Sequence, residues 1–163
     1  MSIRTLQPER LWKEFYEICQ IPHPSKKEEK MIAYLQEFGK RHNLETRTDA
    51  AGNVLICKPA TPGYENRKKV ILQSHMDMVC EKNNDKQHNF DTDPIQPYID
   101  GEWVKAKGTT LGADNGIGMA TELAILASND LKHPALECLF TVDEETGLTG
   151  AFALKEGFMD GDI

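Results

Sequence analysis

The stretch that decides the fold is KVILQSHMDM at residues 69–78. Its unbroken Val-Ile-Leu run is typical of a buried strand, which we expect to end at Ser74. A second apolar run, LECLFTV at 136–142, is also strand-like and ends directly on Asp143. His75 therefore falls at the carboxyl end of the first predicted strand, and Asp143 directly follows the second. The sequence therefore predicts ionisable side chains at the carboxyl ends of buried strands.

Helical and strand patterns alternate along the rest of the chain. Apolar residues spaced three and four apart predict a first helix from Pro8 to Cys19. Ser25 and Glu28 form a capping box, which predicts the start of a second helix that ends near Gly39. The later predicted elements are strands at 44–48 and 53–58, a loop at 80–96, a hairpin at 98–105 around Asp100-Gly101, a helix from about Asp114 to Ser128, and a short helix at 149–155.

This order of elements predicts an α/β fold with a mixed, mostly parallel open sheet flanked by helices. Functional residues of such a sheet lie at its carboxyl edge, so clusters far apart in the sequence can converge there. The hairpins at 44–58 and 98–105 are expected to add antiparallel strands to the parallel part.

Composition limits the classes of function. A chain of 163 residues with 39% hydrophobic residues can form one compact domain with its own core. Its net charge of −7 argues against binding to nucleic acid or to anionic lipid, which select surfaces rich in Lys and Arg. The N-terminal MSIRTLQPERLW has no apolar signal region, and no stretch approaches the roughly 18 apolar residues of a membrane span. We therefore expect a cytoplasmic protein.

The four cysteines are Cys19, Cys57, Cys80 and Cys138. They are widely spaced and form no C-x-x-C pair, which favours reduced thiols over a zinc finger or a thioredoxin-like site. Only Cys80 lies near the predicted chemistry. Its acidic neighbours raise a thiol pKa rather than lower it, so we expect no catalytic role for Cys80.

Three polar clusters carry the predicted chemistry: HMDMV at 75–79, GADNG at 112–116 and DEETG at 143–147. One imidazole with several carboxylates suits zinc, manganese or cobalt. A paired-metal site also needs a bridging carboxylate and a separate free base. The residues that can fill these roles are His75, Asp114, Glu144 and Glu145.

Each cluster also has an ordinary structural explanation. His75 and Asp77 point to one face of an extended chain, so both bind metal or one orients the other; alternatively, His75 packs in the core. Asp114 precedes a predicted helix and could simply cap it, although the glycines around it permit a close backbone approach. The acids from Asp143 to Glu145 are either a solvated turn or a set in which one Glu binds metal while its neighbour accepts a proton.

Four longer strings identify a family resemblance. They are FYEICQIPHPSKKEEKMIAYL at 15–35, LQSHMDMVCEKN at 72–83, TLGADNGIGMA at 110–120 and TVDEETGLTGA at 141–151. In this order the chain resembles the aminoacyl-histidine dipeptidases, a branch of the di-zinc aminoacylase and carboxypeptidase superfamily. Many superfamily members carry Asp-Asp where this chain has Asp114-Asn115, which points toward the dipeptidase branch.

The resemblance implies a role for each candidate residue. His75 is expected to bind one zinc ion and Glu145 the other, with Asp114 bridging the two and manganese or cobalt as substitutes. Asp77 is expected to support His75, and Glu144 to act as the general base in hydrolysis of dipeptides, preferentially Xaa-His. The family also predicts a non-proline cis peptide bond between Asp114 and Asn115.

The resemblance further implies that residues 1–163 are the N-terminal portion of a catalytic domain. Family members take two more metal ligands from downstream sequence, and they have a lid and dimerisation domain that makes the full-length protein a homodimer. Each zinc would have two protein ligands here instead of the three typical of a catalytic site, so we expect this chain alone to be inactive. The alternatives are a di-zinc hydrolase of N-acyl amino acids, a carboxypeptidase, or a non-catalytic domain that keeps the fold.

Overall fold

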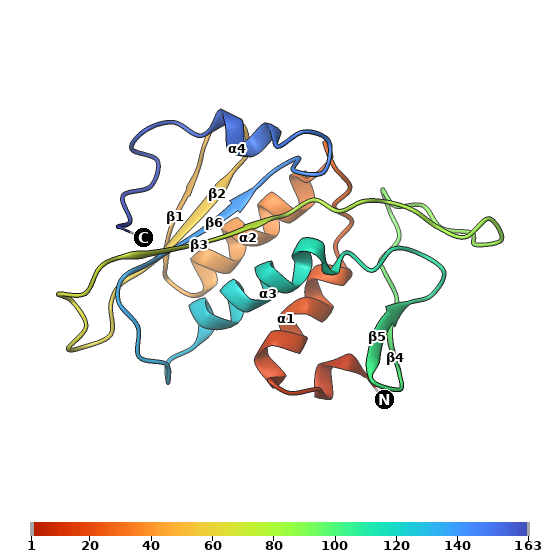
Figure 1. Cartoon of the computed structure of the whole chain (residues 1–163), viewed down its shortest axis with the longest axis horizontal. Helices are drawn as coiled ribbons and strands as arrows, with labels where there is room; N and C mark the ends of the chain where they lie inside the picture. The colour runs from red at the N-terminus through yellow and green to blue at the C-terminus, as the bar shows by residue number, and fades with distance from the viewer. Residues whose placement is uncertain (1, 163) are drawn as a thin grey trace.

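The computed structural model describes residues 2–162, and its main feature is a four-stranded sheet with helices packed against it (Figure 1). The elements in chain order are η1 (Ile3–Thr5), α1 (Glu9–Cys19), α2 (Glu29–Arg41), β1 (Glu45–Thr48), β2 (Val54–Lys58), β3 (Val70–His75), β4 (Pro97–Asp100), β5 (Trp103–Ala106), α3 (Ala113–Ala127), β6 (Leu136–Thr141) and α4 (Thr149–Ala153). Helix α2 packs on β1 and β2, α3 packs on β3, and α1 lies against α3. The predicted α/β fold is confirmed.

The sheet is mixed, with strand order β1-β2-β6-β3. Only β3 and β6 are parallel, whereas β1 pairs with β2 and β2 with β6 in antiparallel fashion. The parallel share is therefore smaller than the sequence predicted for this part of the chain. The reason is that the hairpin at 45–58 lies directly against β6 and contributes two antiparallel strands.

The core lies between the sheet and helices α1, α2 and α3. Strand β6 is buried along its whole length, as its apolar run predicted. The largest fully buried side chains come from η1, from helices α1, α2 and α3, from the sheet and from the residue after β3: Ile3, Phe15, Ile18, Met31, Leu35, Phe38, Leu55, Ile56, Met76, Met119, Leu123 and Phe140. In residues 2–162, no helix has both the length and the apolar character needed to cross a bilayer.

The second helix starts differently from the prediction. Helix α2 begins at Glu29, and its N-cap residue Glu28 makes no side-chain capping hydrogen bond. The capping box predicted from Ser25 and Glu28 is thus wrong. Both side chains bond instead to segments far away in the sequence, because those segments present buried donors and acceptors that a helix end exposed to water does not.

The hairpin around Asp100-Gly101 is confirmed, since Asp100 pairs with Trp103 across a Gly101 with φ of 60°. Strands β4 and β5 form a separate two-stranded sheet beside η1. Residues 80–96 contain no helix and no named strand, as predicted for a loop. The hairpin and this loop lie at one end of the molecule (Figure 1).

A half-buried lysine lies at the carboxyl end of α3. The ammonium of Lys58, at the end of β2, donates hydrogen bonds to the carbonyls of Ile125 and Leu126 at 2.9 Å each, and to that of Ser128. Carbonyls at a helix end lack the usual amide partner four residues on, although that of Ile125 also accepts from the amide of Ser128, and a positive charge is favourable at this end of the helix dipole. Lys58 therefore joins the antiparallel half of the sheet to the helix that begins at the candidate site.

We expect Lys58→Met to lower the free energy of unfolding by about 2 kcal/mol, because it keeps the half-buried apolar stem but removes charged hydrogen bonds to helix carbonyls. Chemical denaturation of this chain measures the effect. Lys132→Met, at an exposed position of the same charge, is the matched control and should change stability by less than about 0.5 kcal/mol. Equal effects of the two substitutions would contradict the role of Lys58.

Candidate metal centre

Three segments from different parts of the chain meet at one edge of the sheet. Strand β3 ends at His75, which pairs with Thr141 at the end of the parallel strand β6. The loop before α3 brings Asp114 to the same place, and the turn after β6 brings Glu145. One side-chain donor atom from each of His75, Asp114 and Glu145 lies within 4.8 Å of the other two. The convergence expected at this edge is therefore present.

The two ring nitrogens of His75 face different partners. Nε2 lies 3.0 Å from Oδ1 of Asp114 and 3.8 Å from Oε2 of Glu144. Nδ1 lies 3.1 Å from the backbone oxygen of Asp77 and 3.3 Å from its Oδ1. The ring is buried, yet both of its polar atoms are turned toward carboxylate or carbonyl oxygens. This arrangement leaves Nε2 directed at the carboxylates, which core packing alone does not require.

Asp77 is buried and connects three segments. Its Oδ1 accepts a hydrogen bond from the amide of Glu144 at 2.9 Å, and its Oδ2 accepts from the amide of Glu145 at 3.2 Å. The hydroxyl of Ser25 also donates to Oδ2, at 2.7 Å. Because these oxygens are already used, the geometry favours orientation of the His75 ring over metal binding by Asp77.

The charges in this cluster shift the ionisation of their neighbours. Burial by itself lowers the pKa of His75, but hydrogen bonds with Asp77 and Asp114 outweigh burial and raise this pKa to about 9. Burial raises the pKa of Asp77, yet the bonds from His75, the two loop amides and Ser25 hold it well below its usual range. Slight burial and the nearby acids raise the pKa of Glu145. The site thus favours a positive charge among its carboxylates.

Asp114 is not the cap of α3. The N-cap residue is Gly112, with φ of 71°, and Asp114 itself has non-helical φ and ψ of −93° and 106°. Its side chain is 86% exposed and points its Oδ1 at His75. The bond between Asp114 and Asn115 is cis, so the cis peptide predicted from the resemblance is confirmed. A side chain at Gly112 would place its Cβ 2.8 Å from Sδ of Met78, so this turn needs glycine for space as well as for its φ.

The three acids after β6 have different surroundings. Asp143 is buried with φ of 49°, and its carboxylate accepts hydrogen bonds from the hydroxyls of Thr146 at 2.6 Å and Thr149 at 2.5 Å. Glu144 is partly exposed and Glu145 is exposed. This segment is therefore not a simple solvated turn, because Asp143 is buried and the backbone amides of the two glutamates are hydrogen-bonded. Their side chains diverge from Asp143 and reach the cluster around His75.

Two residues of this edge were missed as parts of the site. Oε1 of Glu28 accepts a hydrogen bond from the amide of Asp143 at 2.9 Å, and Ser25 bonds to Asp77. Burial, together with the charge of Asp77, raises the pKa of Glu28. One signal was available in the sequence: Glu28 precedes Met31 and Leu35 by three and seven residues, which places it on the apolar face of the predicted helix.

Comparison with known proteins identifies the family. Residues 71–163 match the model of peptidase family M20/M25/M40. The chain belongs to this family. It is 56% identical over 162 residues to the cytosol non-specific dipeptidase of Escherichia coli (strain K12), across 99% of this chain and 33% of that protein. The resemblance to a family of metallopeptidases is thereby confirmed.

Two solved structures are similar to this chain. The crystal structure of aminoacylhistidine dipeptidase from Vibrio alginolyticus has a TM-score of 0.98 and 58% identity, across all of this chain and 33% of that one. A tripeptidase from Staphylococcus aureus has a TM-score of 0.79 and 25% identity, across 97% of this chain and 42% of that one. The chain spans about a third of the length of the two dipeptidases that it matches.

The donor set of this M20/M25/M40 chain fits a divalent metal. An imidazole nitrogen and two carboxylates are ligands that zinc and manganese accept in proteins. Nε2 of His75 faces Asp114 while its Nδ1 is held by Asp77, which is the usual arrangement for a ligating histidine. The exposed side of Asp114 and Glu145 leaves room for further ligands.

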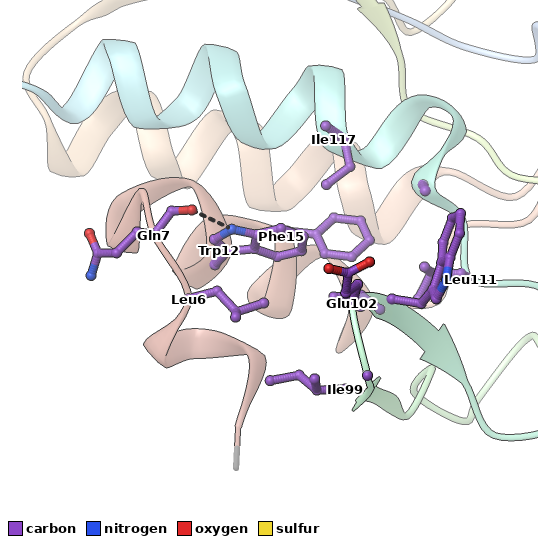
Figure 2. A pocket seen from close by; sticks show the side chains of 12 residues that line it. Leu6, Gln7, Trp12, Phe15, Ile99, Glu102, Leu111 and Ile117 are labelled. Carbon is purple, nitrogen blue, oxygen red and sulfur yellow. Dashed lines mark hydrogen bonds between the residues drawn. The ribbon is translucent and has the colours of Figure 1, made fainter.

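An apolar pocket of about 400 Å³ lies apart from these residues (Figure 2). It is bounded by α1, the β4–β5 hairpin and the start of α3, and Glu102 is its single acidic lining residue. The indole nitrogen of Trp12 donates to the carbonyl of Gln7 at 3.2 Å inside it. The lining residues Leu111 and Ala113 lead into Asp114. The pocket therefore lies next to the backbone that carries Asp114, but none of the candidate ligands lines it.

The thiols take no part in this site. All four cysteines are free, and burial together with Asp91, Glu81 and Asp77 raises the pKa of Cys80 to about 11. The predicted direction of this shift is confirmed. A thiol with such a pKa is protonated at neutral pH and is a poor nucleophile.

The pKa of His75 predicts how the stability of the chelator-treated chain depends on pH. Because the folded pKa of about 9 exceeds the ordinary 6.5, protonation of His75 stabilises the fold fully below pH 6.5, and this contribution is lost as pH rises through 9. Urea unfolding in the presence of chelator should therefore show a falling midpoint from pH 6.5 to 9. His75→Gln should flatten that fall, and an unchanged slope in this variant would refute the assignment.

Proposed function

We propose that residues 1–163 form the N-terminal portion of the catalytic domain of an M20 dipeptidase. The full-length protein is proposed to hydrolyse dipeptides, preferentially Xaa-His, and to act in the cytoplasm as a homodimer. The observation that carries the proposal is the shared ligand set of His75, Asp114 and Glu145. It is supported by the high identity to two dipeptidases along essentially the whole chain.

In this proposal the centre holds two zinc ions, with manganese or cobalt as substitutes. His75 would hold one ion, Glu145 would hold the other, and Asp114 would be a ligand shared by both. When bound, the ions supply Lewis acidity to a water and to the scissile carbonyl. Asp77 contributes by fixing the ring of His75 so that Nε2 faces the carboxylates.

Glu144 is proposed as the general base. Its Oε2 lies 3.8 Å from Nε2 of His75, and its side chain is 34% exposed, so the carboxylate can reach both the centre and an incoming water. It takes a proton from the attacking water and passes it to the leaving amine. The backbone amide of Glu144 is bound to Asp77, which fixes the backbone position from which the side chain extends.

We further propose that this chain alone is inactive. His75, Asp114 and Glu145 would give each ion two protein ligands, whereas a catalytic zinc typically has three. The two dipeptidases are about three times as long as the chain, so the missing ligands, the lid and the dimer interface are proposed to come from the rest of the full-length protein.

Glu144→Gln in the full-length protein tests the base. The amide has the same shape but cannot accept the proton, so we expect kcat for an Xaa-His dipeptide to fall by about 10²–10⁴-fold while two equivalents of zinc still bind. Glu156→Gln, at an exposed position of the same charge, is the control and should leave kcat unchanged.

The substrate assignment is tested with the same preparation. A panel of free dipeptides, N-acyl amino acids and peptides with a free carboxyl end separates the dipeptidase from the two related hydrolases. Turnover of N-acyl amino acids without dipeptide cleavage would replace the proposed substrate. A protein that binds metal and cleaves nothing in the panel would favour a non-catalytic domain.

A further inference from the structure

We propose that Glu28 is a positioning residue of the candidate metal centre, acting together with Ser25. Its carboxylate holds the amide of Asp143 and so fixes the turn at 143–147, which carries Glu144 and Glu145. The inference rests on the proposed function, because it assigns Glu28 its role through those two residues.

Three consecutive backbone amides of the turn donate hydrogen bonds to carboxylates that lie outside it. The amide of Asp143 donates to Oε1 of Glu28 at 2.9 Å, that of Glu144 to Oδ1 of Asp77 at 2.9 Å, and that of Glu145 to Oδ2 of Asp77 at 3.2 Å. Both acceptors belong to buried residues of other segments: Glu28 is 5% exposed and Asp77 is 1% exposed. Hydrogen bonds to ionised acceptors in such places are stronger than neutral ones.

The backbone of Asp143 needs this support. Its φ of 49° lies in the left-handed region, which a residue with a side chain seldom adopts unless its surroundings enforce it. Its amide is buried, so without Oε1 of Glu28 it would be left without a partner. The carboxylate of Asp143 is engaged separately by Thr146 and Thr149, which leaves Glu28 as the acceptor for this amide.

Ser25 and its neighbour His23 bond to the residues that follow β3. Its hydroxyl donates to Asp77, and the amide of Met78 donates to the carbonyl of His23 at 3.2 Å. The segment at 23–28 therefore bonds to the residues after β3 and to the turn after β6. It spans the carboxyl ends of the two parallel strands that carry the candidate ligands.

The geometry favours positioning over a second ion site. Oxygens of Glu28, Asp77 and Asp143 lie within 4.8 Å of one another. Both oxygens of Asp77 and both oxygens of Asp143 already accept hydrogen bonds from amides or hydroxyls. Although Glu28 is the N-cap residue of α2, its side chain makes no capping hydrogen bond to that helix and is free to bond to Asp143.

The test compares Glu28→Leu and Glu28→Gln in the full-length protein. Leucine has a similar volume but no acceptor, whereas glutamine keeps an oxygen that can accept from Asp143. We expect Glu28→Leu to weaken binding of one zinc ion by about 10–100-fold and to lower kcat by a similar factor, with KM changed less than threefold. For Glu28→Gln, both the zinc affinity and kcat should stay within about threefold of those of the unsubstituted protein. The control Glu29→Gln, at an exposed position, should also leave both quantities within that range.

Zinc binding is measured by competition with a chromophoric chelator, and folding by thermal unfolding. These readouts need no substrate, so an absence of dipeptide cleavage would overturn the proposed function while still testing Glu28. The inference fails if Glu28→Leu binds both ions normally, or if Glu28→Gln is as damaging as leucine. Should Glu28→Leu not fold, Glu28→Asp replaces it; the shorter side chain keeps the charge but not the reach, and normal zinc binding by this variant would also overturn the inference.

Discussion

The buried carboxylate of Asp77 is the constraint on which the candidate centre depends. A carboxylate out of water is unfavourable unless it is fully hydrogen-bonded, so the chain must bring donors to it. The donors come from Ser25 and from the amides of Glu144 and Glu145, and the ring of His75 lies beside it. Meeting this one requirement aligns the end of β3, the turn after β6 and the segment before α2.

The parts of the structure that follow from local pattern were predictable. The predicted strands end next to His75 and Asp143, and parallel strands bring their carboxyl ends together, which was enough to place the clusters at one edge. The cis bond at Asp114 was predicted from the family resemblance and not from periodicity. The Asp100-Gly101 hairpin was predictable for a local reason, because its turn needs a positive φ that glycine provides.

The remaining features depend on partners distant in sequence. Ser25 and Glu28 match a helix capping box, but their bonds go to Asp77 and Asp143, and a local motif carries no information about such partners. Sheet pairing was misjudged for a related reason. The apolar run of β6 is typical of any central buried strand. It is compatible with two parallel neighbours and equally with the observed pair, in which β3 is parallel and β2 antiparallel to β6.

The centre has a rigid side and an open side. His75, Asp77, Glu28 and Asp143 are buried and bonded to one another's segments, whereas Asp114 and Glu145 are exposed. Slight burial, followed by the charges of the neighbouring acids, raises the pKa of Glu145, and a cation would offset the repulsion among these acids. The hydrogen bonds of the buried residues orient His75 and the turn at 143–147. The exposed side leaves Asp114 and Glu145 accessible from solvent. The additional ligands implied by the family resemblance would therefore approach Asp114 and Glu145 from the solvent side, without disturbing the hydrogen bonds around Asp77 that set the geometry.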